Sequence, residues 1–274
     1  MNTSSASITL SIASFRAQML GSLMNLGSDA DSSFGDIMSR FQTGNDGLPA
    51  ALSEPQSAYA MMTRINGLDI AYKGQYSELS QMDSYLPRIE EAARQLGQTA
   101  IADANESIAA RLEDFAQQYN AWVQRFKPDV QSGGVLANIQ AAEIPLYELD
   151  QVIENPFIGA KDGFRGLADM GIGIDANTGL MSVNTSQLDA ALGNNKQAVV
   201  DAVKEFSAKF AAEADLLAAD DNLIQHRLDN LDGAIAFIDG NLGSWRQEFG
   251  SGDAANPRGH VAQALAAYNN AGGI

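Results

Sequence analysis

Apolar residues recur at alternating spacings of three and four along much of this chain, which is the heptad pattern of helices that pack along one face. The first such stretch covers residues 57–96. Pro87 interrupts it, because proline inside a helix removes a hydrogen bond and clashes with the preceding turn. We therefore expect a kink or a short break near residues 83–87, where Asp83 and Ser84 could cap a restarted helix.

Two further stretches carry the same pattern. The second covers residues 105–126 and is expected to end at Pro128. The third covers residues 198–249, although Asp221 stands where the next apolar residue after Leu217 should be. We interpret the aromatic residues of the second stretch as core rather than as a ligand surface. The residues expected to serve in stem packing or self-association are Leu112, Phe115, Tyr119, Leu228, Leu231, Ile235, Ile238 and Leu242.

A different pattern separates these two stretches. Apolar residues alternate over positions 170–174, which is typical of a strand with one buried face. Residues 175–179 read Asp-Ala-Asn-Thr-Gly and predict a turn, after which apolar residues resume over 180–183. The polar residues 184–186 then favour a helix cap. We expect one β-hairpin where the chain turns between the two long helices.

The predicted fold class is mainly α, with an antiparallel helical bundle or coiled-coil stem and a small β-hairpin head. Within the N-terminal segment, residues 8–12 could form a strand and residues 15–26 a short amphipathic helix. The predicted segments are a flexible N-terminus (1–56), stem helices (57–127), a small head with the hairpin (128–197), a long coiled-coil helix (198–249) and a flexible tail with a short helix (250–274).

The composition of the chain excludes several classes of function. The 274 residues carry a net charge of −17, so the chain lacks the basic surface with which proteins neutralise nucleic-acid phosphates. No apolar run approaches the ~20 residues that span a bilayer, and we expect no membrane insertion. The chain contains no cysteine, which excludes disulfides and thiolate chemistry. No basic residue precedes the apolar positions of the N-terminus, so we expect no cleaved secretory signal.

Reactive side chains do not gather in the sequence. The two histidines, His226 and His260, have no neighbours at the spacing of metal ligands. Residues 175–179 resemble the start of a calcium loop, but Gly179 offers no side chain at the third ligand position and Ser186 stands where the loop should end in Glu. We predict no catalytic residue, no cofactor site and no metal site, and therefore no enzyme.

Three segments resemble one family. Phe115-Ala-Gln-Gln-Tyr119-Asn120-Ala-Trp122-Val123 is similar to a helix motif of the flagellar filament-capping proteins, also called hook-associated protein 2. Residues 167–192 resemble the hairpin motif of that family and the short helix after it, and residues 222–235 resemble its closing coiled-coil helix. The resemblance covers about residues 105–250. The residues that carry it include Asn120, Gly171, Ile172, Asp175, Gly179 and Leu180.

The resemblance implies a flagellar structural protein that self-associates and helps flagellin or hook-associated subunits assemble. It further implies an extracellular location on the bacterial flagellum, type III export through a flexible N-terminus, and an export chaperone as a partner. Family members are usually longer and carry β-rich domains before the first motif, for which this sequence has no room. We therefore expect a short, divergent form of the filament cap.

Two other interpretations stay open. A cytoplasmic adaptor or secretion chaperone for flagellar components would also be acidic and helical, and it would remain inside the cell. An unrelated helical scaffold is the other interpretation, although the hairpin motif argues against it.

Overall fold

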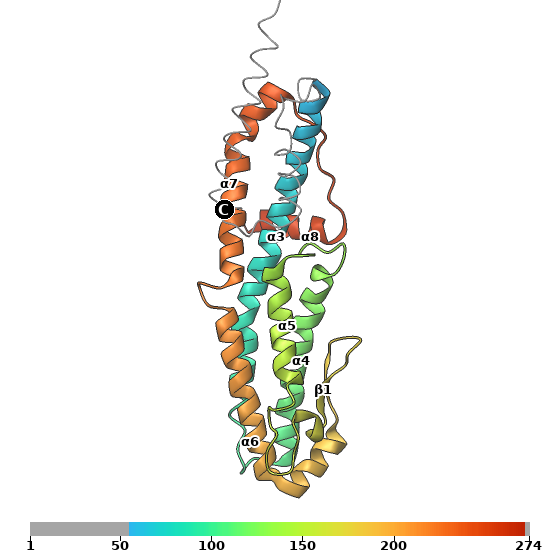
Figure 1. Ribbon diagram of the computed structural model, residues 1–274, viewed down its shortest axis with the longest axis vertical. Helices are drawn as coiled ribbons and strands as arrows, with labels where there is room; N and C mark the ends of the chain where they lie inside the picture. Colours follow the sequence, from blue (N-terminus) through green and yellow to red (C-terminus); the bar gives the residue numbers. More distant parts are fainter. Residues whose placement is uncertain (1–54, 272–274) are drawn as a thin grey trace, which may run out of the picture. The chain divides into compact units, whose positions relative to one another are not determined.

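A computed structural model describes residues 55–271, with side chains from residue 58 onward (Figure 1). This part of the chain is built from α-helices and one two-stranded antiparallel sheet, which confirms the mainly α fold with a β-hairpin. The strand and the helix expected within residues 1–54 lie outside the described residues. The helices are α3 (Pro55–Leu96), α4 (Asn105–Val130), α5 (Gln140–Glu154), α6 (Thr185–Leu217), α7 (Leu223–Phe249) and α8 (Gly259–Asn270).

The chain divides into two compact units. One is Glu78–Arg227, and the other joins the residues up to Ser77 with those from Leu228 onward. Helices α3 and α7 each contribute to both units. The residues that resemble the two motifs, Asn120 and the hairpin, all belong to the unit Glu78–Arg227.

Aromatic contacts fix the direction of the helices in the unit Glu78–Arg227. Phe115 of α4 packs edge-to-face against Phe206 and Phe210 of α6, and Tyr119 packs against Phe210. Because the contacts advance along both helices together, α4 and α6 run in the same direction. All four rings are almost fully buried, and burial of each such side chain contributes about 1.5–3 kcal/mol.

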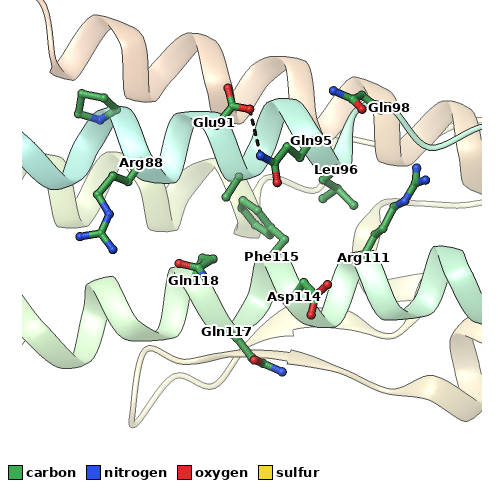
Figure 2. Close-up of a pocket in the computed structure, with 12 residues that line it drawn as sticks. Arg88, Glu91, Gln95, Leu96, Gln98, Arg111, Asp114, Phe115, Gln117 and Gln118 are labelled. Carbon is green, nitrogen blue, oxygen red and sulfur yellow. Dashed lines mark hydrogen bonds between the residues drawn. The ribbon is translucent and has the colours of Figure 1, made fainter.

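Helix α3 runs antiparallel to α4. Tyr85 packs against Trp122 and Phe126 in the second half of α4, whereas the end of α3 at Leu96 lies across from Arg111 near the start of α4 (Figure 2). An edge-to-face or tilted pair of rings adds about 0.5–1.5 kcal/mol beyond the burial itself. An antiparallel bundle was predicted; α3 and α4 do run antiparallel, whereas α4 and α6 run in the same direction.

The break expected near residues 83–87 is wrong, since α3 is helical from Pro55 to Leu96. Ser84 does not cap a restarted helix. Its hydroxyl donates to the carbonyl of Ser80, one turn earlier, at 2.7 Å. Leu86 and Ile89 on either side of Pro87 are buried, and this packing offsets the roughly 3 kcal/mol that an interior proline costs. Pro128 likewise lies inside α4, which ends two residues later at Val130.

The prediction of a single helical stretch over residues 198–249 is also wrong. Helix α6 begins at Thr185 and ends at Leu217, and α7 begins at Leu223. The side chain of Asn222 explains the restart, because its Oδ1 accepts hydrogen bonds from the amides of Ile224 and Gln225 at 2.6 and 3.1 Å. Asn195 interrupts α6 with non-helical backbone angles and accepts a bond from the amide of Ala198 at 3.1 Å.

The other unit has its own apolar core. Met62 and Ile65 of α3 pack with Ile238, Trp245 and Phe249 of α7. The connection that follows α7 is tied to α3. The side-chain Nδ2 of Asn66 donates to the carbonyls of Ser251 and Asp253 at 3.0 and 2.8 Å, and the backbone amide of Asp253 donates to the hydroxyl of Thr63 at 2.8 Å. The expected flexibility of the tail in solution stays a prediction.

Candidate functional site

The hairpin follows a 3₁₀ turn, η2 (Leu167–Met170), and consists of β1 (Ile172–Ile174) and β2 (Met181–Val183). Ile172 pairs with Val183 and Ile174 with Met181. Ile172 and Met181 are buried, whereas Ser182 faces solvent, which agrees with the alternation in the sequence.

Gly171 starts the hairpin in a conformation that favours glycine. Its φ is +81°, and a side chain there would begin 2.8 Å from the carbonyl oxygen of Asn184. The carbonyl of Gly171 accepts a hydrogen bond from the amide of Asn184 at 2.7 Å, and the side chain of Asn184 caps α6 by accepting from the amide of Gln187. Gly171 therefore joins η2 and the hairpin to the start of α6.

The turn of the hairpin is organised by Asp175. Its Oδ1 accepts hydrogen bonds from the amides of Asn177 and Thr178, at 3.0 and 2.8 Å, and from the hydroxyl of Thr178 at 2.9 Å. These bonds, chiefly that from the Thr178 amide, lower the pKa of the Asp175 carboxyl. The backbone closes from Asp175 to Gly179, whose φ is +72°, and to Leu180.

Because the Asp175 carboxylate is engaged inside its own turn, the turn interpretation accounts for residues 175–179 without a metal ion. Within residues 58–271, no three side chains of His, Cys, Asp or Glu gather as metal ligands do. No helix in the described part of the chain is long and apolar enough to span a bilayer.

Asn120 connects the first motif to the hairpin. Its side-chain Nδ2 donates to the carbonyl of Met181 at 2.9 Å, and its Oδ1 accepts from the amide of Met181 at 2.7 Å. The side-chain amide thus bonds the backbone of β2 as a neighbouring strand would. The hairpin does not stand apart as a head on a stalk, since β2 packs on α4 at this point.

Lys127, two turns further along α4, holds the tip of the hairpin. Its ammonium group donates to the carbonyl of Thr178 at 2.8 Å. A side chain at Gly179 would begin 2.6 Å from that nitrogen, so glycine lets the lysine reach the turn. Lys127 is a residue that the sequence analysis missed, although its place seven residues after Asn120 puts both on one face of a helix.

Tyr119 anchors a different side of α4, about 100° around the helix from Asn120. Its ring is buried and its hydroxyl donates to Asp150 of α5 at 3.2 Å. Burial, and then the neighbouring carboxylate of Asp150, raises the pKa of the Tyr119 hydroxyl. Burial also raises the pKa of Asp150. Neighbouring residues of one motif therefore bind two elements, since Tyr119 holds α5 and Asn120 holds β2.

A second polar group that sequence reasoning missed ties α4 to α3. The guanidinium of Arg125 bonds to Glu78 and, at 2.8 Å, to both Gln81 and Asp129. Glu78 and Asp129 are buried, and burial raises the pKa of Glu78, which Arg125 partly offsets. Arg125 and Asp129 are spaced i, i+4, but Asp129 follows Pro128, where the helix was expected to end, so the sequence offered no signal for this group.

The residues expected in stem packing or self-association lie mainly inside a single chain. Leu242 is half-buried and packs against the core of Ile238 and Trp245. The burial of the residues predicted for stem packing or self-association is accounted for by contacts within one chain, so a role between chains stays a prediction. The buried members are Leu112, Phe115, Tyr119, Leu228, Leu231, Ile235 and Ile238.

The arrangement is one of structural support. Hydrogen bonds from Tyr119 and Asn120 hold α5 and the hairpin to α4, and those of Arg125 hold α3 to it. None of these bonds sets a nucleophile beside a base.

The comparisons agree with the motifs. The family model for the C-terminus of flagellar hook-associated protein 2 matches residues 90–249, which is more than half of the chain. The matched part includes Asn120, the hairpin and the whole of α7. No curated protein and no solved structure shows significant similarity to the chain. The chain belongs to the family of flagellar hook-associated protein 2, and residues 90–249 are its C-terminal region.

Proposed function

We propose that this protein is a structural component of the bacterial flagellum that self-associates and helps flagellin or hook-associated subunits to assemble. The match to the hook-associated protein 2 family over residues 90–249 carries the proposal. The internal hydrogen bonds of the two motifs support it, because a subunit that guides assembly has to keep its shape while its partners change.

The motif residues serve the shape of the subunit rather than its recognition of partners. The side chains of Asn120 and Asp175 form hydrogen bonds within the chain, so partners contact other parts of the surface. Exposed large apolar side chains suit such contacts, and Tyr147, Phe157 and Leu216 in the unit Glu78–Arg227 are 59%, 82% and 66% exposed.

In this proposal the protein leaves the cell through the flagellar type III apparatus and acts on the flagellum. Antibody detection tests this on sheared flagella and on cell lysate, in strains with and without a working export apparatus. We expect signal on the flagella only when export works. Signal confined to the cytoplasm of both strains would contradict the proposal and favour an adaptor or secretion chaperone.

A further inference from the structure

Helix α5 carries a large aromatic side chain on the side that faces away from the unit Glu78–Arg227. Its inner side is buried, Ala142 and Leu149 included, and α5 packs chiefly on α6. Tyr147 comes two residues before Leu149 and therefore lies about 160° around the helix from it. The Tyr147 side chain is 59% exposed, and Ile144, one turn earlier, is partly exposed as well.

The turn that follows α5 presents a second aromatic ring. The backbone amide of Phe157 donates to Oδ1 of Asn155 at 3.0 Å, and the amide of Ile158 donates to the carbonyl of Asn155 at 3.2 Å. Ile158 is buried, and a side chain at Gly159 would begin 3.0 Å from Cβ of Ala202 in α6. The turn is thus packed on the unit, yet Phe157 is 82% exposed. Because its backbone is already fixed, binding through this ring costs little conformational entropy.

The surface around Tyr147 is acidic. Each residue advances about 100° around a helix, so Glu143 and Glu154 lie to one side of Tyr147 and Glu148 to the other. The sequence contains no Lys, Arg or His from residue 128 to residue 160. Among the side chains that the structure describes, no cation forms an ion pair with these three carboxylates.

A carboxylate of α6 extends this acidic surface. Burial, and then the negative charge of Glu148, raises the pKa of Glu213. The two carboxylates therefore lie near each other, and no ion pair within residues 58–271 neutralises Glu213 either. A lysine or arginine brought by another molecule would be attracted to this place.

We propose that the outer side of α5, together with Phe157, is a docking surface for an apolar segment of another protein that is flanked by lysines and arginines. The rings of Tyr147 and Phe157 pack among the apolar side chains of that segment, and its cations meet the surrounding carboxylates. A second copy of this chain is a poor occupant, because it brings the same acidic surface and a net charge of −17. The inference rests on the proposed function and names the chemistry of one assembly partner.

A designed peptide tests this chemistry on the purified full chain. The probe is a fluorescently labelled helical peptide of about five turns, with a leucine stripe flanked by lysines. Its counterpart carries glutamate in place of every lysine. Fluorescence anisotropy should give a dissociation constant of roughly 10 to 100 µM for the lysine peptide, because the contact is small. We expect the glutamate peptide to bind at least about tenfold more weakly.

Removing the two rings should weaken the binding of the lysine peptide. Tyr147→Ser with Phe157→Ser changes two exposed positions, so the fold should be kept, and circular dichroism checks this. We expect the dissociation constant to rise by about tenfold or more. Ile101→Ser removes an exposed apolar side chain from the loop between α3 and α4 and is the matched control.

The carboxylates are tested in the same titration. Glu143→Gln with Glu154→Gln should raise the dissociation constant by about threefold to tenfold. Glu106→Gln with Glu113→Gln removes equal charge from exposed positions of α4 and should change it little.

A photoreactive amino acid at position 147 or position 157 tests the surface in the native strain. Mass spectrometry of the joined peptides should identify, at both positions, a segment of another protein in which Lys or Arg flanks apolar residues. The same amino acid at position 101 is the control and should not capture that segment.

Equal binding of the lysine and glutamate peptides would overturn the inference, as would binding that the ring variant retains. A captured segment that is acidic, a segment of a second copy, or no capture at either position would also overturn it. Absence of the protein from flagella would sink the proposed function, whereas the peptide titrations would still report on the surface itself.

Discussion

Asn120 shows how one side chain can determine the position of an element far away in the sequence. Its amide bonds both backbone atoms of Met181, 61 residues later, at the edge of β2. Neighbouring Tyr119 points about 100° away around α4 and bonds Asp150. The sequence identified both as members of a motif. Their partners could not be predicted, because they depend on how the segment between the motifs folds back.

Replacing Asn120 with alanine should loosen the hairpin while keeping the helices. Two hydrogen bonds are lost and the edge of β2 is left without its partner, at a cost of about 1–3 kcal/mol. Chemical denaturation measures the loss, and amide hydrogen exchange at Met181 should become faster. Gln117→Ala, at an exposed position of the same helix, is the control. Equal stability of the two variants would contradict the role given to Asn120.

The buried carboxyl of Glu78 should make the free energy of unfolding depend on pH, in a direction that follows from its raised pKa. Burial raises its pKa above the ordinary value of 4.5, so the folded state holds this proton more tightly than the unfolded chain does. The contribution of Glu78 to stability therefore falls as the pH rises above about 4.5. We expect the free energy of unfolding of the wild type, relative to Glu78→Gln, to fall from about pH 4 to about pH 7.

Urea titrations at several pH values measure this difference. Glu106→Gln, an exposed carboxylate in the first turn of α4, serves as the control. A relative stability of the wild type that rises with pH would mean that Arg125 outweighs burial at this site.

At the scale of elements, the heptad spacing predicted where most helices lie, because the apolar residues that a helix buries on one face recur at that spacing. The prolines, however, led to wrong predictions of helix ends and breaks. Pro87 and Pro128 were expected to end or break helices, but packing of their neighbours holds both inside. The break before α7 depends on the capping bonds of Asn222, for which the polar run at residues 220–222, with Asp221 at an expected apolar position, was the visible sign.

The core between α3 and α7 gives a test at this scale. Ile238 is 7% exposed and lies among Met62, Ile65 and Trp245. Ile238→Asp removes an apolar side chain and buries a carboxylate, so we expect a loss of about 3–5 kcal/mol. Thermal melting followed by circular dichroism measures it. Ala236→Asp, exposed on the same helix, is the control. A melting point that matches the control would show that this cluster does not support the helices.

For the whole molecule, the family could be reached from sequence because three separated segments resembled it in the right order. The match over residues 90–249 confirms that resemblance. What the sequence left open was how these segments meet. Lys127 on the tip of the hairpin and Arg125 between α3 and α4 were missed, since each depends on contacts between segments more than 40 residues apart.

The role in assembly belongs to the whole molecule as well. A scaffold that helps flagellin to assemble should determine how much exported flagellin enters filaments. The direct measurement is the share of exported flagellin in filaments against the share free in the medium, in the native strain, in a strain lacking this protein and in that strain complemented. The account predicts that free flagellin rises without the protein and returns to the native level on complementation. An unchanged share in all three strains would contradict the assembly role.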